Sequence, residues 1–392
     1  MKSATLGEIS DRSNGVIQTG PFGSQLHQSD YRSEGVPVVM PQDIVGNHIS
    51  DEKIAYIDET LATQLGRHLL AQEDIVFPRR GEINKRAIIC AEQVGYFCGT
   101  GCLKISIPPV EIYPKWLFYY LGLEHIVKWI EGNAVGAIML NLNTNILRAL
   151  PIDYPPLDEQ GRIVECLSAY DDLIATNQRR IALLEDAARR LYREWFVHLR
   201  FPGHESVPMK DGVPEGWEQK PLGVIAPLNY GKALKSTDRK DGKVPVYGSS
   251  GIVGVHNVAL VDGGAIVVGR KGNVGSLFFS PVPCFPIDTV YYIVPAQASY
   301  RLFLALHQLN FISSDAAVPG LNRTYAHSLP VLQPSDDVAV AFEGLVQPMF
   351  EQSQHLTEQN TQLARARDLL LPKLMSGELD VSGISMPEEV TA

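Results

Sequence analysis

The sequence predicts an α+β protein in which two similar globular lobes are separated by two long antiparallel coiled-coil helices. The chain has 392 residues, more than one hydrophobic core usually holds. Two segments repeat apolar residues at heptad spacing, and short motifs of the first half recur in the second. We expect five consecutive regions: a lobe at 1–156, a helix at 157–199, a lobe at 200–333, a helix at 334–378 and a flexible tail at 379–392.

Both lobes have the composition of irregular α+β domains, rich in Gly and Pro. Short apolar runs such as VPVVM, AIVVG and VYYIV are bounded by turn residues, as β-strands are. The run WLFYYLGLEHIVKWI predicts a helix in the first lobe, and YRLFLALHQLNF is its counterpart in the second.

The first long helix has a continuous apolar seam. Pro155-Pro156 followed by Asp158 and Glu159 suits its start. Alternating steps of four and three residues, typical of a coiled coil, connect Ile163, Leu167, Tyr170, Ile174, Asn177, Ile181, Leu184, Ala188, Leu191 and Trp195.

The second long helix repeats this spacing with a more polar seam. The predicted seam residues are Val338, Phe342, Leu345, Met349, Gln352, Leu356, Gln359, Leu363, Ala366 and Leu370. Pro348 is expected to kink or divide the helix. Asn177, Gln352 and Gln359 have two possible roles: they fix the register of the pair, or they lie at the edge of an imperfect seam.

The lobes are related by an internal repeat. DIVFPRRGE at 74–82 parallels AIVVGRKGN at 265–273, and Leu142-Asn143 with Leu150-Pro151 parallels Leu321-Asn322 with Leu329-Pro330. The offsets of 191 and 179 residues indicate a tandem duplication with different loop lengths and a pseudo-two-fold axis. Asn143 and Asn322 suit turn or capping positions.

The net charge of −10 is carried mostly by the helical segments and the tail. The lobes are nearly neutral and contain basic runs at 79–86 and 232–243, so the charge permits a DNA partner. Five unpatterned cysteines and the lack of a signal-peptide core suit a cytoplasmic protein. Glu124, His125 and Lys128 interrupt the most apolar stretch, so no membrane partner is expected.

Several motifs resemble those of one family in sequence and in order. TGPFGSQLHQSDY, GVPVVMPQDI, the Arg-Arg-Gly and Arg-Lys-Gly turns, PLDEQGRIVECL, LYREWF, VPEGWE and LLLPKLMSGEL resemble type I restriction–modification specificity subunits. The resemblance implies two target-recognition domains that each read part of a split, asymmetric double-stranded DNA site. It also implies docking of two methyltransferase subunits and, through them, restriction/translocase subunits. The second lobe shows NYGKALKSTDRKDGKVPVYG in place of a GPFGS opening, which indicates a different recognition-domain subtype.

No catalytic constellation is found in the sequence. DYPPL at 153–157 lacks the order of a methyltransferase loop, and GRKGNVGS at 269–276 lacks the order of a phosphate-binding loop. Cys98 and Cys102 have no second ligand pair for a metal. We therefore predict a non-catalytic subunit that binds no cofactor, with S-adenosylmethionine, ATP and Mg²⁺ on its partners. The alternatives are a self-contained methyltransferase or nuclease, and a coiled-coil scaffold that binds no DNA.

The predicted DNA contacts are polar and basic loop residues of both lobes, because such side chains bind phosphates and base edges. In the first lobe they are Ser24, Gln25, His27, Arg79, Arg80, Lys85 and Arg86. In the second lobe they are Lys232, Lys235, Tyr247, Ser249, Ser250, Arg270, Lys271, Asn273 and Arg323. The Arg79-Arg80 and Arg270-Lys271 turns are favoured because both lobes carry paired positive charge there.

Overall fold

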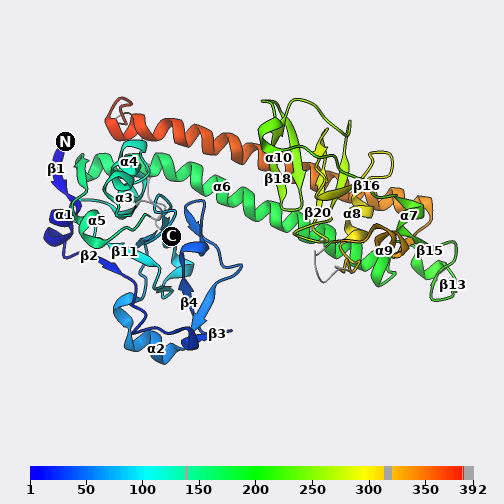
Figure 1. The fold of residues 1–392 in the computed structure, drawn as a ribbon, viewed down its shortest axis with the longest axis horizontal. Coiled ribbons are helices and arrows are strands. Elements are labelled where there is room, and N and C mark those ends of the chain that lie inside the picture. Colours follow the sequence, from blue (N-terminus) through cyan, green and yellow to red (C-terminus); the bar gives the residue numbers. More distant parts are fainter. Residues whose placement is uncertain (137–139, 313–319, 382, 384–392) are drawn as a thin grey trace. The chain divides into compact units, whose positions relative to one another are not determined.

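The computed structural model describes residues 1–136, 140–312, 320–381 and 383. The chain forms two compact units: unit 1 comprises residues 1–174 and 361–392, and unit 2 comprises residues 175–360. Each unit combines short strands and helices, so the predicted α+β class with two globular parts is confirmed (Figure 1). Most of the predicted tail at 379–392 lies outside the described residues.

Unit 1 is built on an antiparallel sheet with the strand order β2-β11-β8-β9. Its strands are β2 (Val16–Thr19), β11 (Cys102–Ser106), β8 (Ile75–Pro78) and β9 (Ala87–Ile88). A second sheet has the order β10-β4-β7-β3, with strands β10 (Phe97–Cys98), β4 (Val36–Val39), β7 (Ala55–Ile57) and β3 (Tyr31–Arg32). The remaining strands pair as β1 (Lys2–Thr5) with β12 (Pro151–Tyr154), and β5 (Ile44–Val45) with β6 (His48–Ile49). The helices are α1 (Leu6–Arg12), α2 (Glu59–Gln64), α3 (Pro114–Tyr120), α4 (Glu124–Asn133) and α5 (Thr144–Arg148).

Unit 2 has a sheet of the same design, with the order β16-β22-β19-β20. Its strands are β16 (Asn229–Tyr230), β22 (Val290–Ile293), β19 (Ala265–Gly269) and β20 (Leu277–Ser280). A second sheet has the order β18-β17-β21, with strands β18 (Gly251–His256), β17 (Val244–Gly248) and β21 (Phe285–Pro286). The ribbons pair β15 (Glu218–Pro221) with β23 (Pro330–Gln333), and β13 (Met209–Lys210) with β14 (Val213–Pro214). The helices are α7 (Leu222–Ile225), α8 (Tyr300–Leu306) and α9 (Arg323–Ser328).

The predicted internal repeat is confirmed by the order of these elements. In each unit an outer ribbon strand and a short helix precede the first strand of the main sheet, and a short capped helix leads into the second ribbon strand. In each second sheet a parallel pair is formed, β4 with β10 in unit 1 and β17 with β21 in unit 2. A long helix then follows the ribbon, as the sequence motifs predict.

The long helices are α6 (Leu157–Tyr192), which continues into a π-helical turn at Arg193–Val197, and α10 (Asp336–Ser376). Each helix contributes residues to both units. Of the two effects predicted for Pro348, a kink or a division of the helix, the division does not occur, because α10 is one helix through this position. Among the described residues no helix has the length and apolarity needed to span a membrane.

Within each unit the two helices run antiparallel. In unit 2 the Phe342 ring lies 5.4 Å from that of Trp195, whereas Asn177 donates a hydrogen bond to Asn360. In unit 1 Arg367 donates to Asp171 at 2.5 Å, and Leu374 joins the core that contains Ile163.

The predicted seam of α6 is buried or half-buried throughout, but the predicted seam of α10 is wrong at three positions, Leu345, Gln352 and Gln359, which are exposed. Leu345 is 48% exposed and Val346 is fully buried instead. Likewise Gln352 is exposed and Ser353 is buried. The seam therefore follows Phe342, Val346, Met349, Ser353, Leu356, Asn360 and Leu363, which is the same heptad spacing in a different phase.

The three polar residues predicted for the seams lie in different surroundings. Asn177 is 1% exposed and donates hydrogen bonds to Gln359 (3.1 Å) and Asn360 (2.9 Å). Gln352 lies outside the seam and Gln359 lies at its exposed edge. Asn177 is thus the residue placed to fix the register of the helix pair.

Candidate nucleic-acid interface

Equivalent basic turns follow the central strand of each main sheet. Arg79-Arg80-Gly81 follows β8 and Arg270-Lys271-Gly272 follows β19. Gly81 and Gly272 have φ values of +79° and +76°, which favour glycine over residues with a side chain. The carbonyl of each arginine accepts a 2.8 Å hydrogen bond, from Leu142 in unit 1 and from Leu321 in unit 2.

The segment bound by each turn leads directly into a short helix with an asparagine cap. The Asn143 side chain accepts from the amide of Ile146 at 3.0 Å, and the Asn322 side chain accepts from that of Tyr325 at 3.1 Å. The predicted capping role of both asparagines is confirmed. The turn and the helix N-terminus are therefore fixed together in each unit.

The openings of the two units also occupy equivalent places, although their sequences differ. Gly20 follows β2 and Gly231 follows β16. A Cβ atom on Gly20 would lie 1.9 Å from the Gly99 carbonyl oxygen, and one on Gly231 would lie 1.9 Å from that of Ile287. Glycine is required at both sites because only it permits this approach.

In unit 1 the predicted residues near the opening differ in their surroundings. Ser24 and His27 are exposed, as is Arg80. Gln25 is half-buried, and its side-chain oxygen accepts from the amide of Phe22 at 3.4 Å. Lys85 forms an ion pair with Glu82 at 2.6 Å, so its charge is partly neutralised.

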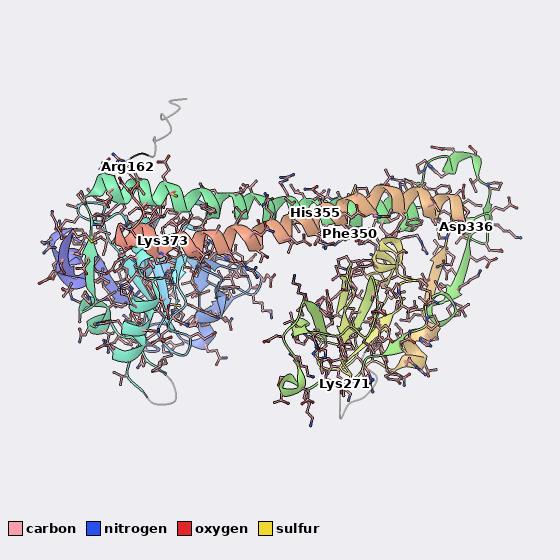
Figure 2. All side chains as sticks on the ribbon, turned by 90° about the horizontal axis from the view of Figure 1, so that it is seen from above. Arg162, Lys271, Asp336, Phe350, His355 and Lys373 are labelled. Atoms are coloured by element: carbon pink, nitrogen blue, oxygen red, sulfur yellow. The ribbon has the colours of Figure 1, made fainter. Side chains whose placement is uncertain are left out.

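In unit 2 the predicted residues form a larger polar surface. Exposed side chains are those of Lys232, Lys235, Ser250, Lys271, Asn273 and Arg323, and those of Ser249 and Arg270 are half-buried. Asn273 donates to the Ser250 hydroxyl at 3.3 Å. Figure 2 shows Lys271 on the side of unit 2 away from the part of α10 marked by Asp336 and Phe350.

Two predicted contacts are wrong because their side chains are buried. Arg86 is 7% exposed, donates to the Phe118 carbonyl at 2.8 Å and packs on the Phe118 ring. Burial lowers the pKa of Arg86 to about 10. Tyr247 is 6% exposed and belongs to a core cluster with Val267 and Cys284, where burial raises its pKa.

The sequence analysis missed two exposed aromatic side chains beside the basic turns. Phe22 is 54% exposed and lies under Arg79, with 5.6 Å between the guanidinium carbon and the ring centroid. Tyr230 is 49% exposed and lies under Arg270 at 5.0 Å and under Arg323 at 4.8 Å. Both flank the equivalent glycines, a signal available in the sequence.

The described residues contain no group of three or more His, Cys, Asp or Glu side chains able to hold a metal ion. Cys98 and Cys102 are free and buried. Burial raises the pKa of Cys98 to about 12, so the thiol stays protonated. Both cysteines serve the core of unit 1.

Comparison with known proteins identifies the family. The model of the type I restriction modification DNA specificity domain matches residues 25–186 and 214–330, more than half of the chain, and each match contains one basic turn. The chain belongs to this family. The family predicted from the motifs is thus confirmed, and with it the assignment to the non-catalytic DNA-specificity component of type I restriction–modification systems.

Individual relatives agree with the family assignment. The type I restriction enzyme MjaIX specificity subunit of Methanocaldococcus jannaschii is 24% identical over 308 residues, covering 70% of this chain and 71% of the relative. The HindI specificity subunit of Haemophilus influenzae is 20% identical, covering 72% and 81%. The crystal structure of a type I S subunit from M. genitalium has the same fold, with a TM-score of 0.57, 18% identity and 95% coverage of both chains.

Proposed function

We propose that this specificity-family chain reads a bipartite, asymmetric double-stranded DNA site, one part with each unit. The observation that carries the proposal is the basic turn repeated at equivalent positions after β8 and β19. The repeated fold provides one DNA-binding surface on each unit, and arginine or lysine side chains on each surface can bind phosphates or guanine edges.

The two parts of the site differ in sequence under this proposal because the surroundings of the turns differ. Phe22, Ser24 and His27 belong to the opening of unit 1, whereas Tyr230, Lys232 and Lys235 belong to the opening of unit 2. Different donors and acceptors recognise different base edges.

The long helices act as the spacer and as the docking surface for two methyltransferase subunits in this proposal. Each contributes residues to both units, and the 36 residues of α6 correspond to about 54 Å of helix. Half-sites on one face of a duplex recur about every 34–36 Å, so an unread spacer lies between them. Restriction/translocase subunits join through the methyltransferases. S-adenosylmethionine, ATP and Mg²⁺ belong to these partners.

Methylation mapping tests the split site. The chain is co-expressed with its methyltransferase subunit, and genomic DNA is read by single-molecule sequencing. We expect one motif made of two different parts around a spacer of fixed length. A continuous or palindromic motif would contradict the proposal, and methylation by the purified chain alone would support a self-contained enzyme instead.

A paired insertion tests the spacer. Four residues are added after Ala182 in α6 and four after His355 in α10, which keeps the helix pair matched in length. About 6 Å of added helix should lengthen the spacer by nearly two base pairs while both recognised parts stay the same. An unchanged spacer in an active complex would remove the helices from this role.

A further inference from the structure

An exposed aromatic ring supports the equivalent arginine in each unit. Phe22 lies under Arg79 in unit 1, and Tyr230 lies under Arg270 in unit 2. The rings come from different sides of the equivalent glycine, two residues after Gly20 and one residue before Gly231. Two different local sequences therefore place an aromatic ring against the equivalent arginine of each unit.

Each of these arginines lies on an aromatic ring, and the described residues show no carboxylate within ion-pair distance of Arg79, Arg270 or Arg323. The Arg79 Nε is buried without a hydrogen-bond partner in the described structure. Arg270 donates to the Asp288 carbonyl at 3.2 Å. A guanidinium on a π face keeps its full charge and leaves N–H groups along its edge available, whereas a carboxylate would occupy them.

Tyr230 supports more charge than Phe22. Arg270 and Arg323 both lie on it, and the buried Tyr291 ring lies 5.1 Å away, centroid to centroid. The Tyr291 hydroxyl donates to the Leu321 carbonyl at 2.9 Å, which ties this ring to the segment that begins α9. The exposed ring is thus supported from the core while its outer surroundings are cationic.

We propose that Phe22 and Tyr230 are positioning residues for DNA reading, which hold Arg79 in unit 1 and both Arg270 and Arg323 in unit 2 with their N–H edges toward the duplex. The inference rests on the proposed function and deepens it. A side chain ordered before binding loses less conformational freedom when DNA arrives, so the rings raise affinity without forming the base contact themselves.

Leucine and phenylalanine variants separate the aromatic face from apolar bulk. The full chain in complex with its methyltransferase subunits is titrated against the mapped duplex and against duplexes scrambled in one half-site, with fluorescence anisotropy as the readout. Tyr230→Leu should weaken binding to the intact site about 5- to 30-fold, because it removes the ring face on which two guanidinium groups lie. Phe22→Leu removes the support of a single guanidinium and should weaken binding about 2- to 5-fold. Tyr230→Phe should restore affinity to within about 2-fold, since the ring remains.

Half-site dependence distinguishes positioning from a structural role. The loss of affinity from Tyr230→Leu should be much smaller when the half-site read by unit 2 is scrambled, because only a phosphate contact of Arg323 is independent of sequence, and it should persist in full when the other half is scrambled. Tyr113→Leu at the start of α3 is a matched control on an exposed tyrosine, with affinity and melting temperature unchanged. Equal losses on all duplexes, no loss with either leucine variant, or failure of Tyr230→Phe to restore binding would each overturn the inference. Failure of the proposed function would show separately, as a wild-type complex that does not distinguish intact from scrambled duplexes.

Discussion

Units 1 and 2 share their sheet topology, but the main sheet of unit 1 contains a buried ion pair where unit 2 has uncharged residues. In unit 1 the Lys104 ammonium donates to the Asp74 carboxylate at 3.3 Å and to the Leu69 carbonyl at 2.7 Å, and both side chains are buried. Asp74 precedes Arg79 by five residues, and Ala265 precedes the equivalent Arg270 by five, so Ala265 is the counterpart of Asp74 in unit 2. Lys104 pairs with Val76 across the sheet, and Tyr292 pairs with the equivalent Val267, so Tyr292 is the counterpart of Lys104.

This difference shows that the sheet does not need a buried ion pair to form. The pair in unit 1 is instead tied into its own surroundings, because Asp74 also accepts from the amide of Ala71 at 2.9 Å and from the Ser106 hydroxyl. A buried pair is costly to break although an apolar replacement of both partners is often tolerated.

Breaking the pair should give the largest effect. Asp74→Ala, which imports the residue of unit 2, leaves the Lys104 ammonium buried without its carboxylate. We expect the free energy of unfolding of unit 1 to fall by about 3–5 kcal/mol. Urea denaturation measures the loss, and hydrogen exchange read by mass spectrometry localises it to unit 1.

The double variant Asp74→Ala with Lys104→Met is the control for this prediction. It removes both charges, so most of the lost stability should return. A double variant as unstable as Asp74→Ala alone would mean that the carboxylate acts mainly through Ala71 and Ser106.

The pH dependence of unit 1 should come next in size. His68 is 2% exposed, and burial together with the positive charges of Arg67 and Lys104 lowers its pKa to about 4. The unfolded chain protonates this histidine near pH 6.5, so between pH 6.5 and 4 the unfolded state binds more protons. Stability should fall by up to about 3 kcal/mol as the pH falls through this window, and should not depend on His68 above it.

Denaturation of wild type and His68→Gln at several pH values measures this contribution. The variant lacks the titrating ring, so its stability should depend less on pH between 6.5 and 4. Parallel curves for the two proteins would contradict the prediction, because they would show that His68 binds protons equally in the folded and unfolded states.

The helix pair also differs between the units. Unit 1 contains the Asp171–Arg367 ion pair, and the Tyr119 hydroxyl donates to the same carboxylate at 2.5 Å. The repeat offset of 179 residues makes Phe350 of unit 2 the counterpart of Asp171, and Ala188 the counterpart of Arg367. The ion pair between the helices of unit 1 is therefore replaced by two apolar side chains at the equivalent positions of unit 2.

Asn177→Leu should reduce the specificity of helix pairing with a smaller change in stability. Its own side-chain oxygen is buried without a hydrogen-bond partner among the described residues, and the same offset places Leu356 at the related position of α10. We expect stability to change by no more than about 1 kcal/mol and oligomers to form, because a single seam asparagine selects one pairing. Sedimentation velocity checks this, with the exposed Gln352→Ala as control. A purely monomeric variant would contradict the prediction.

The sequence was sufficient for the fold class, the repeat and the family because each depends on motifs in chain order. The seam of α10 was placed in the wrong phase because heptad spacing alone fits two choices. The offset of 179 residues resolves them, since it maps Leu167 onto Val346 and excludes Leu345. Internal repeats therefore carry information on register that a single helix lacks.

The interface was harder to predict because burial depends on contacts distant in sequence. Arg86 follows a basic run but lies against Phe118 and Gly122, from another part of the chain. Conversely, Phe22 and Tyr230 are aromatic residues that the choice of polar and basic side chains left out. Each lies within two residues of a glycine at which two backbone segments approach closely.

The smallest predicted effect concerns the first residue of the short helix after each turn, which is Thr144 in α5 and Arg323 in α9. Arg323→Thr should make the negative slope of log affinity against log salt concentration shallower by about 0.9, and Thr144→Arg should make it steeper by about 0.9, if each arginine neutralises one phosphate. Titrations at several salt concentrations measure both slopes. An unchanged slope with altered half-site preference would assign Arg323 to a base edge instead, and the extra guanidinium of unit 2 would then serve sequence discrimination, because a base contact releases no condensed counterion.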